Sequence, residues 1–139
     1  MKIKPEKKTP PHEIAIRELD EIKQQKLWQH GLNKEYYTNL TDTLRKYIVH
    51  RFGVDAMEMT SGEILDIIRK EAEAGSVYGN LEQILKLSDL VKFAKLKTLP
   101  DENDLSLVNA YLFVNQTKIV EVAPPNKEEI ESDPTIIKE

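Results

Sequence analysis

Apolar residues recur at spacings of three and four along most of the chain, and this period predicts helices. The predicted helices cover residues 11–30, 33–52, 61–74, 80–99 and 101–117. Only residues 119–122 alternate as a strand does, and the sequence offers no second strand to pair with them. Short connections between consecutive helices favour antiparallel neighbours. The sequence therefore predicts an all-α fold in which about five helices form a compact bundle.

Residues that cap or end helices set the expected boundaries. Thr60 and Glu63 have the spacing of a capping box, in which each side chain bonds the backbone N–H of the other residue. The other expected boundary residues are the N-caps Asn33 and Asn80 and the C-terminal stops Gly31 and Gly53. Residues 75–79 are expected to form a turn.

The apolar faces of the predicted helices define an expected core. From the second to the fourth helix, its members are Leu44, Tyr47, Ile48, Ile64, Ile68, Leu85 and Phe93. On the fifth helix, the expected buried face is Leu105, Val108, Leu112 and Phe113.

Composition supports one folded domain with two different ends. The chain has 139 residues, of which 40% are hydrophobic and 32% charged. No apolar run approaches the roughly 18 residues of a membrane span. We expect a flexible basic lead at residues 1–10, a single helical domain at 11–118, and an acidic, proline-containing disordered tail at 119–139. The net charge of −4 argues against a nucleic-acid-binding protein, which usually has a basic face.

Side chains that carry chemistry form no recognisable site in the sequence. The chain has no Cys, which excludes disulfides, thiolate zinc sites and cysteine nucleophiles. His12, His30 and His50 each lack a second His three or four positions away, as a helical metal pair would require. The carboxylates of residues 101–104 lack the Gly and Glu that complete a calcium loop. We therefore expect no catalytic residue, no cofactor and no metal, and a protein that is not an enzyme.

The remaining candidate is a set of cations among apolar positions of the second and fourth helices: Arg45, Arg51, Lys92 and Lys95. One interpretation is a basic surface with aromatic edges that receives an acidic partner. The other is an ordinary helix exterior, in which Arg and Asp pair between helices and lysines extend over the apolar seam. Lys92 and Lys95 flank Phe93 and are three residues apart, which places them on neighbouring positions of one helix face.

Four stretches in a fixed order carry a family resemblance: residues 11–19, 34–47, 51–65 and 87–95. In this order the chain resembles the C-terminal soluble helical domain of membrane-anchored, BatD-like proteins of the Bat (aerotolerance) operons. Those operons also encode a MoxR-type AAA ATPase and von Willebrand factor A-domain proteins. The resemblance offers no catalytic residue to place on this chain.

The resemblance implies that this soluble domain is part of a longer, membrane-anchored parent and lies on the cytoplasmic face of the inner membrane. The lysines at positions 2, 4, 7 and 8 would then be the basic flank of a preceding membrane span. The implied function is docking of proteins from the same operon, such as the ATPase. The alternative is a cytosolic helical domain that binds nucleic acid through the four cations, which the net acidity disfavours.

Overall fold

The computed structural model describes residues 9–120, apart from the side chains of residues 72 and 73. Five α-helices and three 3₁₀-helices make up this part of the chain, which contains no strand. The α-helices are α1 (Pro11–Gln25), α2 (Asn33–Phe52), α3 (Ser61–Lys70), α4 (Tyr78–Phe93) and α5 (Pro100–Thr117). The 3₁₀-helices are η1 (Trp28–His30), η2 (Ala56–Glu58) and η3 (Ala72–Val77). The all-α class is confirmed, whereas residues 1–8 and 121–139 lie outside the described residues.

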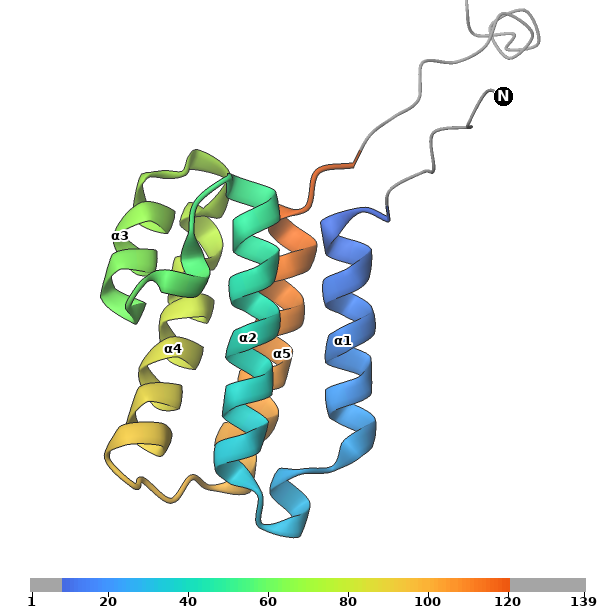
Figure 1. Cartoon of the computed structure of the whole chain (residues 1–139), viewed down its shortest axis with the longest axis vertical. Coiled ribbons are helices and arrows are strands. Elements are labelled where there is room, and N and C mark those ends of the chain that lie inside the picture. Colours follow the sequence, from blue (N-terminus) through green and yellow to red (C-terminus); the bar gives the residue numbers. More distant parts are fainter. Residues whose placement is uncertain (1–8, 121–139) are drawn as a thin grey trace, which may run out of the picture.

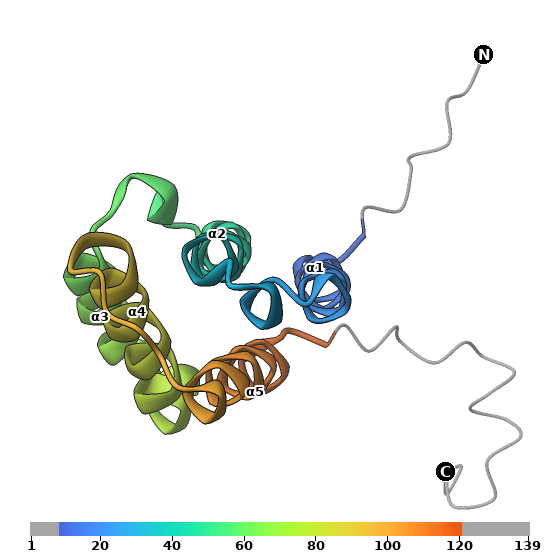
Figure 2. The same ribbon diagram turned by 90° about the horizontal axis from the view of Figure 1, so that it is seen from below.

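Four helices form an antiparallel bundle, and α3 lies against the outside of α4. Helices α1, α2, α4 and α5 alternate in direction and stand side by side in Figure 1. Seen from below in Figure 2, they form a ring in which α2 and α5 each contact both α1 and α4. The start of α1 and the end of α5 share one end of the bundle, and the connection from α4 to α5 lies at the other end (Figure 1).

The structure confirms two expected helix boundaries, the start of α3 and the end of α2. Thr60 Oγ1 accepts the Glu63 N–H at 3.2 Å, and Glu63 Oε1 accepts the Thr60 N–H at 3.1 Å, which completes the capping box. The bond from the Thr60 N–H, with a further contribution from the Thr60 side chain, holds the pKa of Glu63 below its usual value, because it favours the charged carboxylate. Gly53 ends α2 in the left-handed region, at φ 69°, and its N–H bonds the carbonyl of Val49.

The first helix is shorter than predicted. It ends at Gln25 because Lys26 adopts a left-handed conformation, with φ 50°. The chain then forms η1, and the Leu32 N–H bonds the carbonyl of Leu27 at 2.9 Å. Gly31, at φ 79°, stops this short helix rather than α1 itself.

Neither expected asparagine cap was right. Asn33 is the first residue of α2, and its Nδ2 donates across the bundle end to Thr98 Oγ1 at 3.0 Å. Asn80 lies inside α4, which already begins at Tyr78, so the expected turn at 75–79 is instead the end of η3 and the start of α4. Asn80 Nδ2 bonds Asn109 Oδ1 on α5 at 2.8 Å. Asn33 thus connects α2 to the segment between α4 and α5, and Asn80 connects α4 to α5.

The expected core is confirmed on α2, α3 and α4, with one exception. The buried side chains that were predicted are Leu44, Tyr47, Ile48, Ile64, Ile68 and Leu85. Phe93 was predicted to join them, but its side chain is 78% exposed. The reason is that Phe93 lies on the outer side of α4, seven residues after the exposed Lys86 and away from the side that buries Ser88 and Val91.

The predicted buried face of α5 is wrong except for Phe113. Leu105, Val108 and Leu112 are exposed at 48%, 52% and 38%. The face that points inward is largely polar and comprises Asn103, Ser106, Asn109, Ala110, Phe113, Val114 and Thr117. Hydrogen bonds from α2 and α4 satisfy these polar groups, as buried polar groups require, and this pairing offsets their desolvation.

The described residues after α5 form no strand, and Glu121 and Val122, the rest of the predicted strand, lie outside the described part. Among residues 9–120, no helix combines the length and the apolar character needed to span a membrane.

Candidate interaction surface

The four predicted cations lie at three separate places on the bundle. Arg45 and Lys92 are neighbours between α2 and α4, close enough that the charge of Arg45 contributes to lowering the pKa of Lys92. Lys95 lies just after α4. Arg51 lies on the last turn of α2, at the opposite end of the bundle. The structure therefore brings Arg45 and Lys92 together, keeps Lys95 near Lys92 at the end of α4, and separates Arg51 from all three.

Arg45 holds a loop in place. Its Nη1 donates to the carbonyl of Ala56 at 2.9 Å and also to the carbonyl of Met59. These two carbonyls flank η2, so the guanidinium fixes the connection between α2 and α3 against α2. Hydrogen bonds from a charged donor to buried acceptors are worth about 1.5–3 kcal/mol. Substituting Arg45 would therefore change folding before it changed any docking.

Lys92 is half-buried on the side of α4 that faces α2. Its Nζ lies 3.4 Å from Thr41 Oγ1 and 5.7 Å from the centroid of the Phe93 ring. Burial lowers the pKa of Lys92, with a further lowering by Arg45 and an opposing contribution from Asp89 and Asp42. The ammonium thus lies at the edge of an exposed aromatic ring, within cation–π range.

We name the end of the bundle around Phe93 the α4–α5 tip. It comprises four exposed apolar side chains, Leu90, Phe93, Leu96 and Leu99, and three cations, Lys92, Lys95 and Lys97. Phe93 is the most exposed large apolar side chain in the described part of the chain. Aromatic residues such as Phe93 are enriched at the centre of protein interfaces, whereas lysines suit the polar rim, where they can face an acidic partner.

The backbone after Phe93 ends α4 with a left-handed residue. The Ala94 and Leu96 N–H groups both bond the carbonyl of Leu90 at 3.0 Å. These two bonds require a left-handed residue between them, and Lys95 takes that place with φ 55°. Glycine is the usual residue at such a position, so a lysine here adopts the left-handed conformation at some conformational cost.

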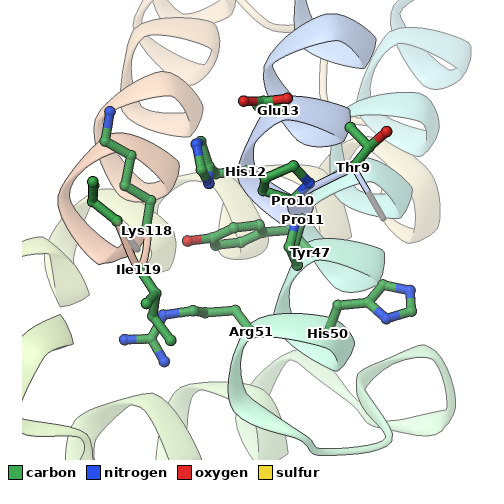
Figure 3. Close-up of a pocket in the computed structure, with 11 residues that line it drawn as sticks. Thr9, Pro10, Pro11, His12, Glu13, Tyr47, His50, Arg51, Lys118 and Ile119 are labelled. Carbon is green, nitrogen blue, oxygen red and sulfur yellow. The ribbon is translucent and has the colours of Figure 1, made fainter. Parts of the chain in front are cut away.

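Arg51 belongs to a different feature, a cavity of about 810 Å³ at the end of the bundle that holds the start of α1 (Figure 3). Tyr47 and Arg51 reach from α2 toward the end of α5 and Lys118, and His12 and His50 also line the space. Arg51 Nε donates to the carbonyl of Thr117, at the negative end of the α5 dipole. Its guanidinium also lies 4.6 Å from the centroid of the Phe52 ring.

The three histidines do not meet in one cluster. His12 and His50 line the cavity beside Arg51, and His30 Nδ1 lies 2.7 Å from the carbonyl of Lys26. Across residues 9–120, no group of three or more His, Asp or Glu side chains is placed to hold a metal ion.

Sequence analysis identified the cations at the tip but missed its apolar members. Leu90 lies within α4 on its exposed side, whereas Leu96 and Leu99 were assigned to a fourth helix up to residue 99 and lie instead in the connection to α5. A sequence signal was present: three lysines are interspersed among six apolar residues between residues 90 and 99. This pattern fits neither a helix face nor a buried strand.

Comparison with known proteins finds no match to this chain among family models, curated proteins or solved structures.

Proposed function

We propose that this chain is a non-enzymatic interaction domain that docks a protein partner through the α4–α5 tip. The observation that carries the proposal is the side chain of Phe93, 78% exposed and flanked by Lys92 and Lys95. Exposing an aromatic ring to water is unfavourable, and burying it against a partner removes that cost. Aromatic residues in the centre of an interface commonly dominate its binding energy.

The chemistry of the tip specifies the partner. Three lysines around an apolar centre fit an acidic surface that offers an apolar pocket for the phenyl ring. Phosphate backbones are a poorer fit, because nucleic-acid binding requires a concentrated cationic face. Arg51 lies at the far end of the bundle, and Arg45 is occupied by carbonyls of its own chain.

The family resemblance supplies candidate partners for this surface. By resemblance, the domain is the cytoplasmic part of a membrane-anchored, BatD-like protein at the inner membrane. Its partners are then the MoxR-type AAA ATPase or the von Willebrand factor A-domain proteins of the same operon. This assignment rests on the sequence motifs, and the tip provides the surface through which it would operate.

A binding titration with these partners tests the proposal. The informative variant combines Phe93→Ser with Lys95→Glu, because both side chains are exposed and neither fixes the bundle. Lys92 is left unchanged, since it is half-buried against α2. We expect wild-type protein to bind one partner and the double variant to lose at least tenfold in affinity, with a larger difference at low salt.

The matched control makes the same two kinds of change elsewhere, as Met57→Ser with Lys70→Glu. Met57 and Lys70 are exposed on η2 and on the last turn of α3, and the net charge changes by the same amount. Circular dichroism and thermal unfolding should match for all three proteins. Equal affinity of the tip variant and the control would exclude the tip as the docking site.

A further inference from the structure

Helix α5 presents its apolar side to water. Leu105, Val108 and Leu112 lie at positions i, i+3 and i+7, which is one stripe along a helix. They lie opposite the inward face, where Asn103, Ser106 and Asn109 are buried. We name this stripe the α5 outer face. Its side chains are exposed, whereas Asn103 and Ser106 on the inward side contact the tyrosines of α2.

The α5 outer face is also free of charge. Residues 105–117 contain no Asp, Glu, Lys or Arg, in a chain of which 32% is charged. On α1 and α2, by contrast, most exposed positions carry charged side chains. Depletion of charge together with exposed aliphatic residues distinguishes the centre of an interface from the rest of a protein surface. The next residues bracket the stripe with opposite charges, Asp101 and Asp104 before it and Lys118 after it.

We propose that the α5 outer face binds the same face of a second copy of this chain, with the two α5 helices antiparallel. An interface with two-fold symmetry must be complementary to itself. The stripe meets this condition, because a two-fold axis near Val108 places Leu105 of one copy beside Leu112 of the other. The same axis places Val108 beside Val108.

The charges at the two ends determine the antiparallel direction. In that arrangement, Lys118 of each copy lies within about one helical turn of Asp101 of the other. A parallel arrangement would instead place Asp101 and Asp104 beside their own equivalents, where like charges repel. The helix dipoles add to this preference, since antiparallel neighbours bring opposite ends together.

The pairing is independent of the docking function proposed above. The α4–α5 tip lies at one end of the bundle, whereas the outer face runs along the side of α5. Three apolar side chains from each copy form a small interface, so the dimer should be weak and depend on concentration. Loss of partner binding in the tip variant should leave this self-association unchanged.

Sedimentation equilibrium over a wide concentration range tests for the second copy. The chain has a mass of 16.0 kDa, and we expect the apparent mass to rise toward about 32 kDa with concentration. Val108→Asp should keep the protein monomeric, because it places two carboxylates together at the centre of the interface. Met57→Asp introduces the same charge at a similarly exposed residue on η2 and should leave the dimer intact.

Single cysteines test the direction of the helices without adding charge. The natural chain has no Cys, so each variant reports one position. A disulfide needs Cα atoms within about 7 Å. Leu105 and Leu112 are seven residues, or about 10 Å, apart along the helix. In the antiparallel dimer, Val108→Cys should cross-link to itself, whereas Leu105→Cys should cross-link efficiently only when mixed with Leu112→Cys.

Three outcomes would overturn the proposal. An apparent mass that stays at 16.0 kDa at every concentration excludes the second copy. If Val108→Asp then abolished binding of a purified operon protein, the α5 outer face would bind that partner instead. A dimer that survives Val108→Asp would place the interface elsewhere. Efficient self-cross-linking of both Leu105→Cys and Leu112→Cys would show parallel helices.

Discussion

The hydroxyl of Tyr37 donates a hydrogen bond to Oδ1 of Asn103 at 2.8 Å, and both side chains are buried between α2 and α5. The neighbouring Tyr36 donates to the backbone carbonyl of the same Asn103 at 2.7 Å. Ser106 Oγ lies 3.2 Å from the Tyr37 hydroxyl, one turn further along α5. Two adjacent tyrosines thus fix how α5 is rotated about its axis. Its polar side turns inward, and its apolar side is left outside.

Replacing Tyr37 with Phe should lower the free energy of unfolding by about 1–3 kcal/mol, because it removes the donor to a buried amide oxygen. Urea denaturation followed by circular dichroism measures this change. Tyr78→Phe is the control, since the Tyr78 hydroxyl accepts a hydrogen bond from Arg69 at the protein surface. That substitution should stay within about 0.5 kcal/mol. Similar losses in the two variants would mean that the Tyr37–Asn103 bond adds no stability of its own.

The buried tyrosines also predict a loss of stability at alkaline pH. Burial raises the pKa of Tyr37 to about 12 and raises the pKa of Tyr36 and Tyr47 as well. An unfolded chain loses its tyrosine protons near pH 10, so above that pH the folded state binds more protons than the unfolded state. The contribution is complete below about pH 10 and is lost as pH rises to about 12, and for Tyr37 alone it is about 2–3 kcal/mol.

Urea denaturation at several pH values between 8 and 12 should show this decline. Tyr37→Phe should show a shallower decline than the wild type, because it lacks one of the shifted groups. Tyr78→Phe is the control, because it removes a hydroxyl that contacts Arg69 at the surface and leaves the three buried tyrosines in place. Parallel slopes for wild type and Tyr37→Phe would contradict the assignment of the effect to this tyrosine.

The helical period was sufficient to predict which residues form helices, but not which side of α5 faces inward. On α2, the apolar positions and the buried positions coincide, as Leu44 and Ile48 show. On α5, both sides contain apolar residues, so periodicity could not choose between Leu112 and Val114. The choice depends on the partners that α2 offers across the bundle, here the tyrosine hydroxyls. The sequence shows which side chains can form hydrogen bonds, but not how far apart those side chains lie in the fold.

The sequence was sufficient to name the cations of the candidate surface, but not to predict where each of them lies or what it contacts. Arg45 and Lys95 both appeared as helix cations, yet Arg45 bonds carbonyls near η2 and Lys95 takes a left-handed conformation after α4. The contacts of Arg45 depend on the path of the connection between α2 and α3, and the conformation of Lys95 depends on where α4 ends. Phe93 is exposed because it lies on the outer side of α4.

Two apolar truncations should separate the core from the tip. Leu44→Ala should reduce the free energy of unfolding by about 2–5 kcal/mol, because Leu44 is fully buried in the centre of α2. Phe93→Ala should change it by no more than about 0.5 kcal/mol, because the ring is mostly in water. Chemical denaturation of the two variants in parallel measures both values. A loss above about 2 kcal/mol for Phe93→Ala would show that the ring packs against the bundle.

Two buried serines should respond to the same substitution with opposite signs. Ser88 on α4 and Ser106 on α5 are both inaccessible to solvent. Ser88 Oγ has no hydrogen-bond partner within the described part of the chain. Ser106 Oγ donates to the Glu102 carbonyl at 3.0 Å and accepts from Gln83 Nε2 at the same distance. The two residues therefore differ mainly in whether the hydroxyl is satisfied.

Ser88→Ala should raise the free energy of unfolding by up to about 1 kcal/mol, because it removes an unsatisfied buried hydroxyl and introduces a better helix former. Ser106→Ala gains the same helix propensity but leaves Gln83 without its acceptor, so it should lose about 1–2 kcal/mol. Urea denaturation of both variants against wild type gives the two signs directly. A loss for Ser88→Ala as large as that for Ser106→Ala would mean that the Ser88 hydroxyl has a partner in solution, such as a buried water.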